Sequence, residues 1–145
     1  MQIRIGFGAV LIVSLIGGCA TGTPPRTVYQ DPVTIIRIQS DSKAGQGHTH
    51  PATVSLDAMR YVLHGMRIQS RNSVVPSILT GEASLVAAFS QDEQSVLGPH
   101  LSRALAEARP DELSTFYRRI STPATGLAIT SGGLFVHGRH LYVIR

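Results

Sequence analysis

Four of the six histidines lie in two short patterns that could bind a metal ion. His48 and His50 are separated by one residue, and His137 and His140 by two. Imidazole is the commonest metal ligand, so these residues could bind zinc or copper if their two loops met in space. No cysteine or acidic residue stands at the short spacings of known zinc motifs. The sequence therefore predicts four candidate metal ligands, with ordinary loop histidines as the alternative.

Recognisable catalytic chemistry is sparse. The chain contains no Gly-x-Ser-x-Gly motif, and its one cysteine, Cys19, lies in a segment with another predicted role. The acidic pairs at 92–93 and 111–112 fall in the first turn of a predicted helix or just after a proline, where negative charge favours the helix dipole. We therefore predict no catalytic residue and no cofactor.

The first 19 residues have the three parts of a bacterial export signal. Arg4 supplies the positive start, and residues 5–16 form an apolar run of about 12 residues, shorter than the roughly 20 that span a bilayer. The next residues, Ile16-Gly17-Gly18-Cys19, resemble the lipobox of bacterial lipoprotein precursors. This resemblance implies cleavage after Gly18, a diacylglycerol thioether on Cys19 and usually a further acyl chain, such as palmitate, on its new amine.

The resemblance also implies a location. Several acyl chains on Cys19 would anchor the chain stably, because each buried methylene contributes about 0.8 kcal/mol. Ala20 follows the cysteine, where an aspartate retains lipoproteins in the inner membrane of enterobacteria. We therefore expect an outer-membrane lipoprotein of a two-membrane cell, with the bilayer as one partner and a domain that faces the periplasm.

The mature chain is expected to form one small domain. Its 145-residue precursor leaves room for one core, and a 43% hydrophobic share excludes wholesale disorder. Removal of residues 1–18 leaves a formal net charge of +3, carried by scattered residues that are arginines apart from Lys43. A GC-rich genome explains the arginines, and contact with anionic lipid or an acidic partner would also suit them. Nucleic acid is excluded as a partner, because an exported lipoprotein rarely meets it.

Two helices and several strands must position these residues. A first helix should begin at Ser55 and end near Gly65, because its apolar residues repeat at helical spacing. Ser90 and Glu93 form a capping-box pattern at the start of a second helix, which should end before Pro110. Pro99 predicts either a kink in that helix or the start of a new one.

The remaining segments predict a sheet. A tether at 19–32, rich in proline and threonine, should lead to a domain at 33–145. Strands are expected at 33–39, 66–70, 82–89, 113–120 and 125–130, an edge segment or loop at 74–78, a turn or bulge at 132–133, and a hairpin formed by 134–136 and 141–144. This order predicts the α+β class, with two helices packed on a mostly antiparallel sheet that ends in a β-hairpin or meander.

These features together favour a binding protein over an enzyme. The leading hypothesis is a lipid-anchored module that binds or scaffolds another cell-envelope protein without catalysis, through the glycine-rich loop 43–50 and the hairpin tip 137–140. A periplasmic metal-binding lipoprotein that uses the four loop histidines is the first alternative. An envelope hydrolase is the second, and it would need a base and a nucleophile or metal in one cleft.

Overall fold

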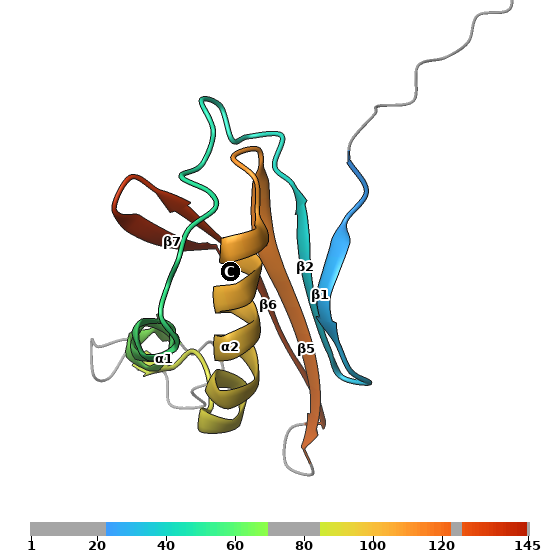
Figure 1. Ribbon diagram of the computed structural model, residues 1–145. Helices are drawn as coiled ribbons and strands as arrows, with labels where there is room; N and C mark the ends of the chain where they lie inside the picture. The colour runs from blue at the N-terminus through green and yellow to red at the C-terminus, as the bar shows by residue number, and fades with distance from the viewer. Residues whose placement is uncertain (1–22, 70–84, 123–125, 145) are drawn as a thin grey trace, which may run out of the picture.

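Five antiparallel strands form the main sheet, in the order β1-β2-β5-β6-β7 (Figure 1). They are β1 (Arg26–Gln30), β2 (Thr34–Ser40), β5 (Glu112–Thr122), β6 (Gly126–His137) and β7 (His140–Ile144). The computed structural model describes residues 23–69, 85–122 and 126–144. Two helices accompany this sheet, so the predicted α+β class is confirmed.

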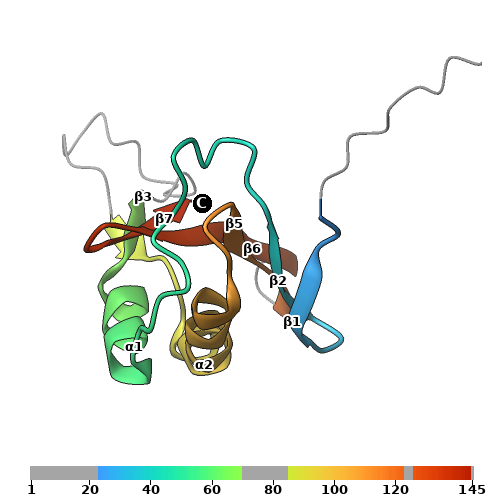
Figure 2. The same cartoon turned by 45° about the horizontal axis from the view of Figure 1, so that its top comes forward.

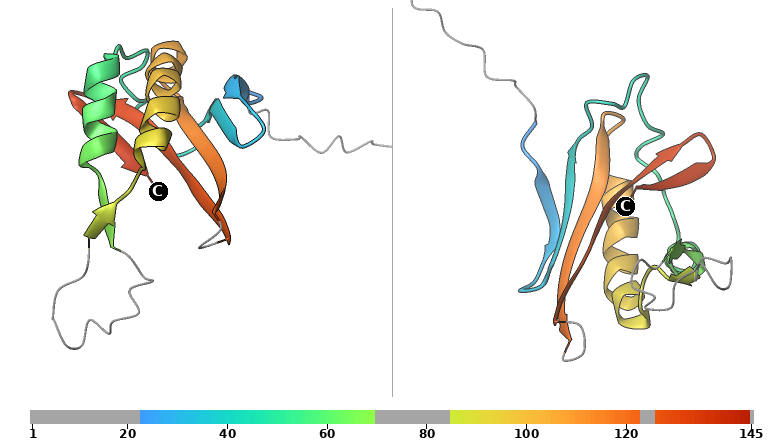
Figure 3. Two further views of the ribbon diagram at one scale, coloured as in Figure 1. Left: turned by 90° about the horizontal axis from the view of Figure 1, so that it is seen from below. Right: turned by 180° about the vertical axis from the view of Figure 1, so that it is seen from behind.

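Both helices lie on the same side of the main sheet (Figure 2; Figure 3, left). They are α1 (Leu56–Gly65) and α2 (Gln91–Glu107). In the chain order, two short strands stand between them, β3 (Arg67–Gln69) and β4 (Leu85–Ala87), which pair as a small second sheet. β3 and β4 fall within the strands predicted at 66–70 and 82–89, whereas the segment predicted at 74–78 lies outside the described residues. No helix in the described part of the chain combines the length and the apolar character that a membrane crossing needs.

Local capping explains where the helices begin. The Ser55 hydroxyl accepts a hydrogen bond from the backbone N–H of Ala58 at 3.2 Å. At α2, the Ser90 hydroxyl accepts from the Glu93 N–H while the Glu93 carboxylate accepts from the Ser90 N–H, which confirms the predicted capping box. Pro99 lies inside α2, which continues as one helix to Glu107.

The core forms between the helices and one face of the main sheet. Side chains along β2 and β5 point alternately to the two faces of the sheet, so that Ile36, Ile38 and Phe116 are buried while the residues between them are more exposed. The buried partners from α1, α2 and β6 are aliphatic: Met59, Leu63, Leu97, Leu101, Leu105 and Leu134. The amphipathic spacing predicted for both helices is therefore what covers this side of the sheet.

The structure corrects the predicted tether, because residues 26–30 are the edge strand β1. Two long-range contacts hold this strand against the rest of the domain. The Arg26 guanidinium donates to the Glu112 carboxylate at 2.7 Å, and the Tyr29 ring stacks on His100 of α2 with ring centroids 3.8 Å apart. The available signal was local, since Thr27, Val28 and Tyr29 favour a strand and β1 pairs with the neighbouring β2.

The turn or bulge predicted at Gly132-Gly133 is also wrong. Both glycines lie inside β6, which is one strand from Gly126 to His137. A side chain at Gly132 would meet the backbone oxygen of Ile144 and would come within 2.9 Å of the Phe116 ring. Glycine here therefore allows a close approach of neighbouring groups. The predicted C-terminal hairpin is confirmed, with Gly138 at φ 60° in the two-residue turn between β6 and β7.

Candidate interaction surface

The main sheet has a second face that none of the described helices covers. On β5 the side chains alternate between the two faces, so that Phe116 and Arg118 are buried while Tyr117 is 40% exposed. We call this second side the bare face. From β2 to β7 its residues are Ile35, Arg37, Gln39, Leu113, Thr115, Tyr117, Arg119, Ser121, Leu127, Ile129, Ser131, Gly133, Phe135, Tyr142 and Ile144.

The bare face carries several exposed apolar side chains. Leu127 is 60% exposed, Ile144 54%, Ile129 51% and Tyr142 45%. Leu127 and Ile129 lie near the start of β6, whereas Tyr142 and Ile144 lie on β7 opposite Phe135 and Gly133, so they form two apolar pairs on the same face. Exposed apolar groups rimmed by polar residues are typical of interaction sites in soluble domains.

Two shallow grooves meet in the middle of the bare face, at the Ile35 and Tyr117 side chains. One groove, of about 270 Å³, extends from this pair to Arg119 and to the turn between β1 and β2. The other, of about 310 Å³, extends from the same pair to Arg37 and Gln39. Ile35 and Tyr117 are direct cross-strand partners, so a single apolar pair separates two hollows that each contain an arginine.

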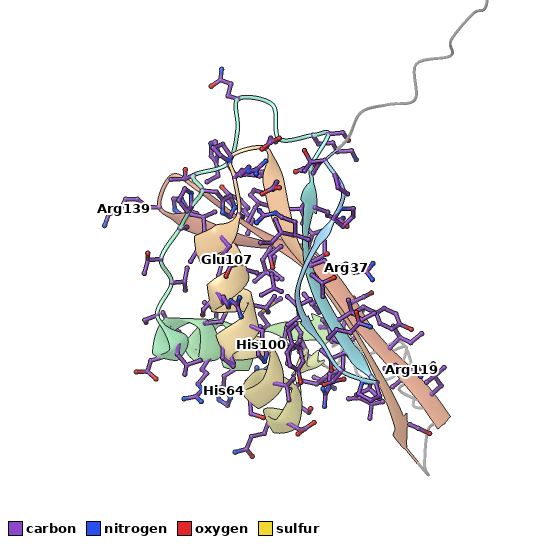
Figure 4. The ribbon with its side chains drawn as sticks, turned by 45° about the vertical axis from the view of Figure 1, so that its right-hand side comes forward. Arg37, His64, His100, Glu107, Arg119 and Arg139 are labelled. Atoms are coloured by element: carbon purple, nitrogen blue, oxygen red, sulfur yellow. The ribbon has the colours of Figure 1, made fainter. Side chains whose placement is uncertain are left out.

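The two arginines of the bare face lack an acidic partner among the described residues. Figure 4 shows Arg37 and Arg119 on the side of the sheet away from His100 and Glu107 of α2. Both side chains are exposed, and neither takes part in an ion pair within the ranges that the structure describes. The surface therefore presents uncompensated positive charge beside apolar groups.

The acidic residue next to these grooves, Asp31, is already engaged elsewhere. Its carboxylate accepts hydrogen bonds from the backbone N–H groups of Val33 and Thr34 at 2.7 and 2.6 Å, and from the Tyr29 hydroxyl at 2.9 Å. Desolvation raises the pKa of Asp31, but these hydrogen bonds outweigh it and hold the pKa below its usual value. Asp31 therefore closes the β1–β2 turn, and no ion pair joins it to Arg119 among the described contacts.

Two acid–arginine contacts on the helix side, each with one buried and one exposed partner, were not predicted from the sequence. Glu112 is 2% exposed and accepts from Arg26 at 2.7 Å and from the Arg109 N–H at 2.8 Å. Arg118 is 7% exposed and donates to the Thr34 hydroxyl at 2.6 Å and to the Asp92 carboxylate at 2.5 Å. The alternation of side chains along β5 could have indicated this placement, because it puts Glu112 and Arg118 on the same face of the sheet as Phe116.

The two histidine loops do meet in space, through backbone hydrogen bonds. The Thr49 N–H donates to the Val136 carbonyl at 2.7 Å, and the Thr49 hydroxyl accepts from the Gly138 N–H at 2.7 Å. The segment around Thr49 therefore lies beside the C-terminal end of β6, beyond the level at which β5 begins to pair with it. This contact ties the predicted loop 43–50 to the predicted hairpin tip 137–140.

His50 completes this junction as a buried, neutral imidazole. Its Nε2 accepts from the Val136 N–H at 3.2 Å, and its Nδ1 lies 3.3 Å from the Leu105 carbonyl oxygen, to which it donates. Desolvation lowers the pKa of His50, partly opposed by the hydrogen bond to Leu105. Both ring nitrogens are used by backbone groups, so His50 offers no lone pair to a metal ion.

The other three predicted metal ligands do not converge. The His48 Nε2 lies 2.9 Å from the Asp41 carboxylate, and its ring stacks on Phe135 with centroids 4.2 Å apart. His137 and His140 are exposed beside the hairpin turn. Across the described ranges, no three His, Cys, Asp or Glu side chains are grouped so that they could hold a metal ion. The predicted four-histidine site is therefore corrected to structural and surface histidines.

Cys19, the predicted lipidation site, lies outside the described residues, so its acylation stays a prediction. No known protein family matches the chain, and neither a curated protein nor a solved structure shows significant similarity to it.

Proposed function

We propose that this chain is a bacterial envelope lipoprotein, anchored in the outer membrane through acylated Cys19, whose periplasmic domain binds another envelope protein without catalysis. The observation that supports the binding role is the bare face, where apolar side chains share one side of the sheet with two arginines that have no ion-pair partner among the described residues. Aromatic residues and arginine are the types enriched in protein–protein interfaces. The lipobox-like segment ending at Cys19 supports the anchor.

The geometry supports the bare face over the two loops predicted as contact surfaces. In the loop 43–50, His50 is buried in the domain, the His48 ring stacks on Phe135 at one end of the bare face, and Thr49 bonds to the hairpin. The exposed side chains of loop and hairpin tip are mainly polar, including Lys43 and Arg139. The bare face offers more apolar surface, which provides most of the favourable free energy of association.

The test is site-specific photocrosslinking of the lipidated chain in its native cells. A photoreactive phenylalanine analogue replaces Tyr117 in one variant and Tyr61 of α1 in a matched control. Tyr61 is 81% exposed, against 40% for Tyr117, so simple accessibility would favour the control position. We expect a discrete protein adduct from position 117 and none from position 61.

Three outcomes contradict the proposal. Equal adducts from both positions would show non-specific contact, and no adduct from position 117 would remove the bare face as a binding surface. Mass spectrometry of the same sample reports the acyl mass on Cys19. An unmodified cysteine would overturn the anchor and the predicted location.

A further inference from the structure

The two arginines of the bare face stand at a regular interval along the sheet. Arg37 is the cross-strand partner of Thr115, and the Ile35–Tyr117 pair lies two residues further along β5. Arg119 follows after another two residues of β5. The order along the strand direction is therefore arginine, apolar pair, arginine, in equal steps.

This interval matches the repeat of an extended peptide. A strand rises about 3.3 Å per residue, so four residues of β5 separate the levels of Arg37 and Arg119 by about 13 Å. A peptide lying extended over the bare face, parallel to the strands, has the same rise. Its side chains at positions i, i+2 and i+4 point to one side, because side chains alternate along extended backbone.

From this register we infer that the bare face recognises an extended acidic segment, with carboxylates at positions i and i+4 for Arg37 and Arg119 and an apolar side chain at i+2 for Ile35 and Tyr117. The inference rests on the proposed function and names the chemistry of the partner. Each guanidinium can take a carboxylate in a bidentate pair, a geometry that lysine does not provide. The two grooves on either side of Tyr117 contain Arg37 and Arg119, so they lie where the carboxylates at i and i+4 would enter.

Charge also disfavours the simplest competing occupant, a second copy of the chain. A face-to-face pair would bring Arg37 and Arg119 of both copies into one interface. The described residues of this face include no carboxylate to compensate them, and Asp31 at its edge is already engaged in three hydrogen bonds. Like charges brought together in this way disfavour self-association.

The experiment measures binding of synthetic peptides to the full lipidated chain in a non-ionic detergent. Fluorescein-labelled peptides of threonine and valine carry two glutamates spaced three, four or five residues apart, and a further peptide has glutamines in place of the glutamates. Fluorescence anisotropy at low ionic strength gives the dissociation constants. We expect the spacing of four to bind tightest, the glutamine peptide to lose binding, and added salt to weaken the interaction.

Matched variants identify the residues responsible. Arg37→Gln and Arg119→Gln are each expected to weaken the best peptide by up to about fivefold, the upper range for an exposed ion pair. Arg139→Gln removes the same charge from the exposed hairpin tip (Figure 4) and should leave binding unchanged. Since all three side chains are exposed, circular dichroism should report an unchanged fold for each variant.

Several results would overturn the inference. A peptide affinity that does not depend on glutamate spacing, or an equal loss of affinity in Arg139→Gln, would indicate general attraction to a basic protein. Binding to phosphatidylglycerol vesicles that is lost in the Arg37/Arg119 double variant, without peptide binding, would assign these arginines to a lipid surface. If the peptides fail while position 117 still crosslinks to a protein, the proposed function stands and the acidic segment is wrong.

Discussion

The two faces of the main sheet are built from alternate residues of the same strands, yet they are stabilised in different ways. On the helix side, Phe116 and Leu134 are buried against helix residues, and Arg118 has charged and polar partners. On the bare face, the adjacent Tyr117 and Arg119 are exposed, and Arg119 has no ion-pair partner in the described part of the chain. The comparison shows that one-residue steps along β5 and β6 separate buried residues of the core from residues exposed to solvent.

The largest expected difference is between Phe116 and its neighbour Tyr117. Phe116→Ala removes a 3% exposed ring from the core, and such truncations cost about 3–5 kcal/mol of unfolding free energy. Tyr117→Ala should cost about 1 kcal/mol or less, since it loses mainly cross-strand contacts with Ile35. Urea denaturation measures both values, and similar losses for the two variants would show that the faces are not distinct.

The next largest difference in stability is expected between Arg118 and Arg119, which are neighbours on β5. Arg118→Ala removes hydrogen bonds to Thr34 and Asp92, and a charged hydrogen bond contributes about 1.5–3 kcal/mol. Asp92 is 72% exposed, so solvent screening places the loss toward the lower end of this range. Arg119→Ala should change stability by about 0.5 kcal/mol or less. Thermal denaturation of both variants tests this, and a larger effect at Arg119 would contradict the assigned orientations.

The two glycines of β6 extend the contrast to a second strand. Gly132→Ala places a methyl group against the Ile144 backbone oxygen and the Phe116 ring, and overpacking of this kind costs about 1–3 kcal/mol. Gly133→Ala meets chiefly the tip of the flexible Leu113 side chain at 3.0 Å, so its cost should be about 0.5 kcal/mol or less. If chemical denaturation gave the reverse order, the close approach at Gly132 would be refuted.

The smallest effect concerns pH and the buried His50. Its folded pKa lies below its ordinary value of 6.5, so the unfolded chain binds the proton more tightly. The stability contributed by neutral His50 is fully present above about pH 6.5 and is lost as the pH falls through the folded pKa. The Tm of the wild type should therefore fall more steeply between pH 7 and 5 than that of His50→Gln, which keeps an acceptor for the Val136 N–H.

A matched control for this pH effect is His64→Gln, which replaces an exposed histidine of α1. Its Tm should follow the wild-type curve in the same range. His100, whose pKa is also lowered by desolvation and by nearby Arg103, stays in all three proteins and contributes equally to each. Parallel curves for the wild type and His50→Gln would contradict a neutral His50 in the folded state.

Local sequence determined the helices and much of the strand order. Ser55, Ser90 and Glu93 cap the helices through contacts within three residues, so their pattern predicts the observed starts. The helical apolar spacing and the β-branched composition of β2 depend on neighbours in the chain and were sufficient to predict the α+β class. The lipobox-like segment at Cys19 is likewise a property of the sequence alone.

Tertiary structure decided what depends on contacts between distant residues. β1 pairs with the neighbouring β2, and its place against the rest of the domain depends on Arg26 and Tyr29, which contact Glu112 and His100 far along the chain. His50 was a candidate metal ligand until the fold brought Val136 and Leu105 to its two ring nitrogens. The interval between Arg37 and Arg119 likewise exists because β2 and β5 pair in one register. Such pairings join residues about eighty positions apart, so they arise from packing of the whole domain rather than from local preference.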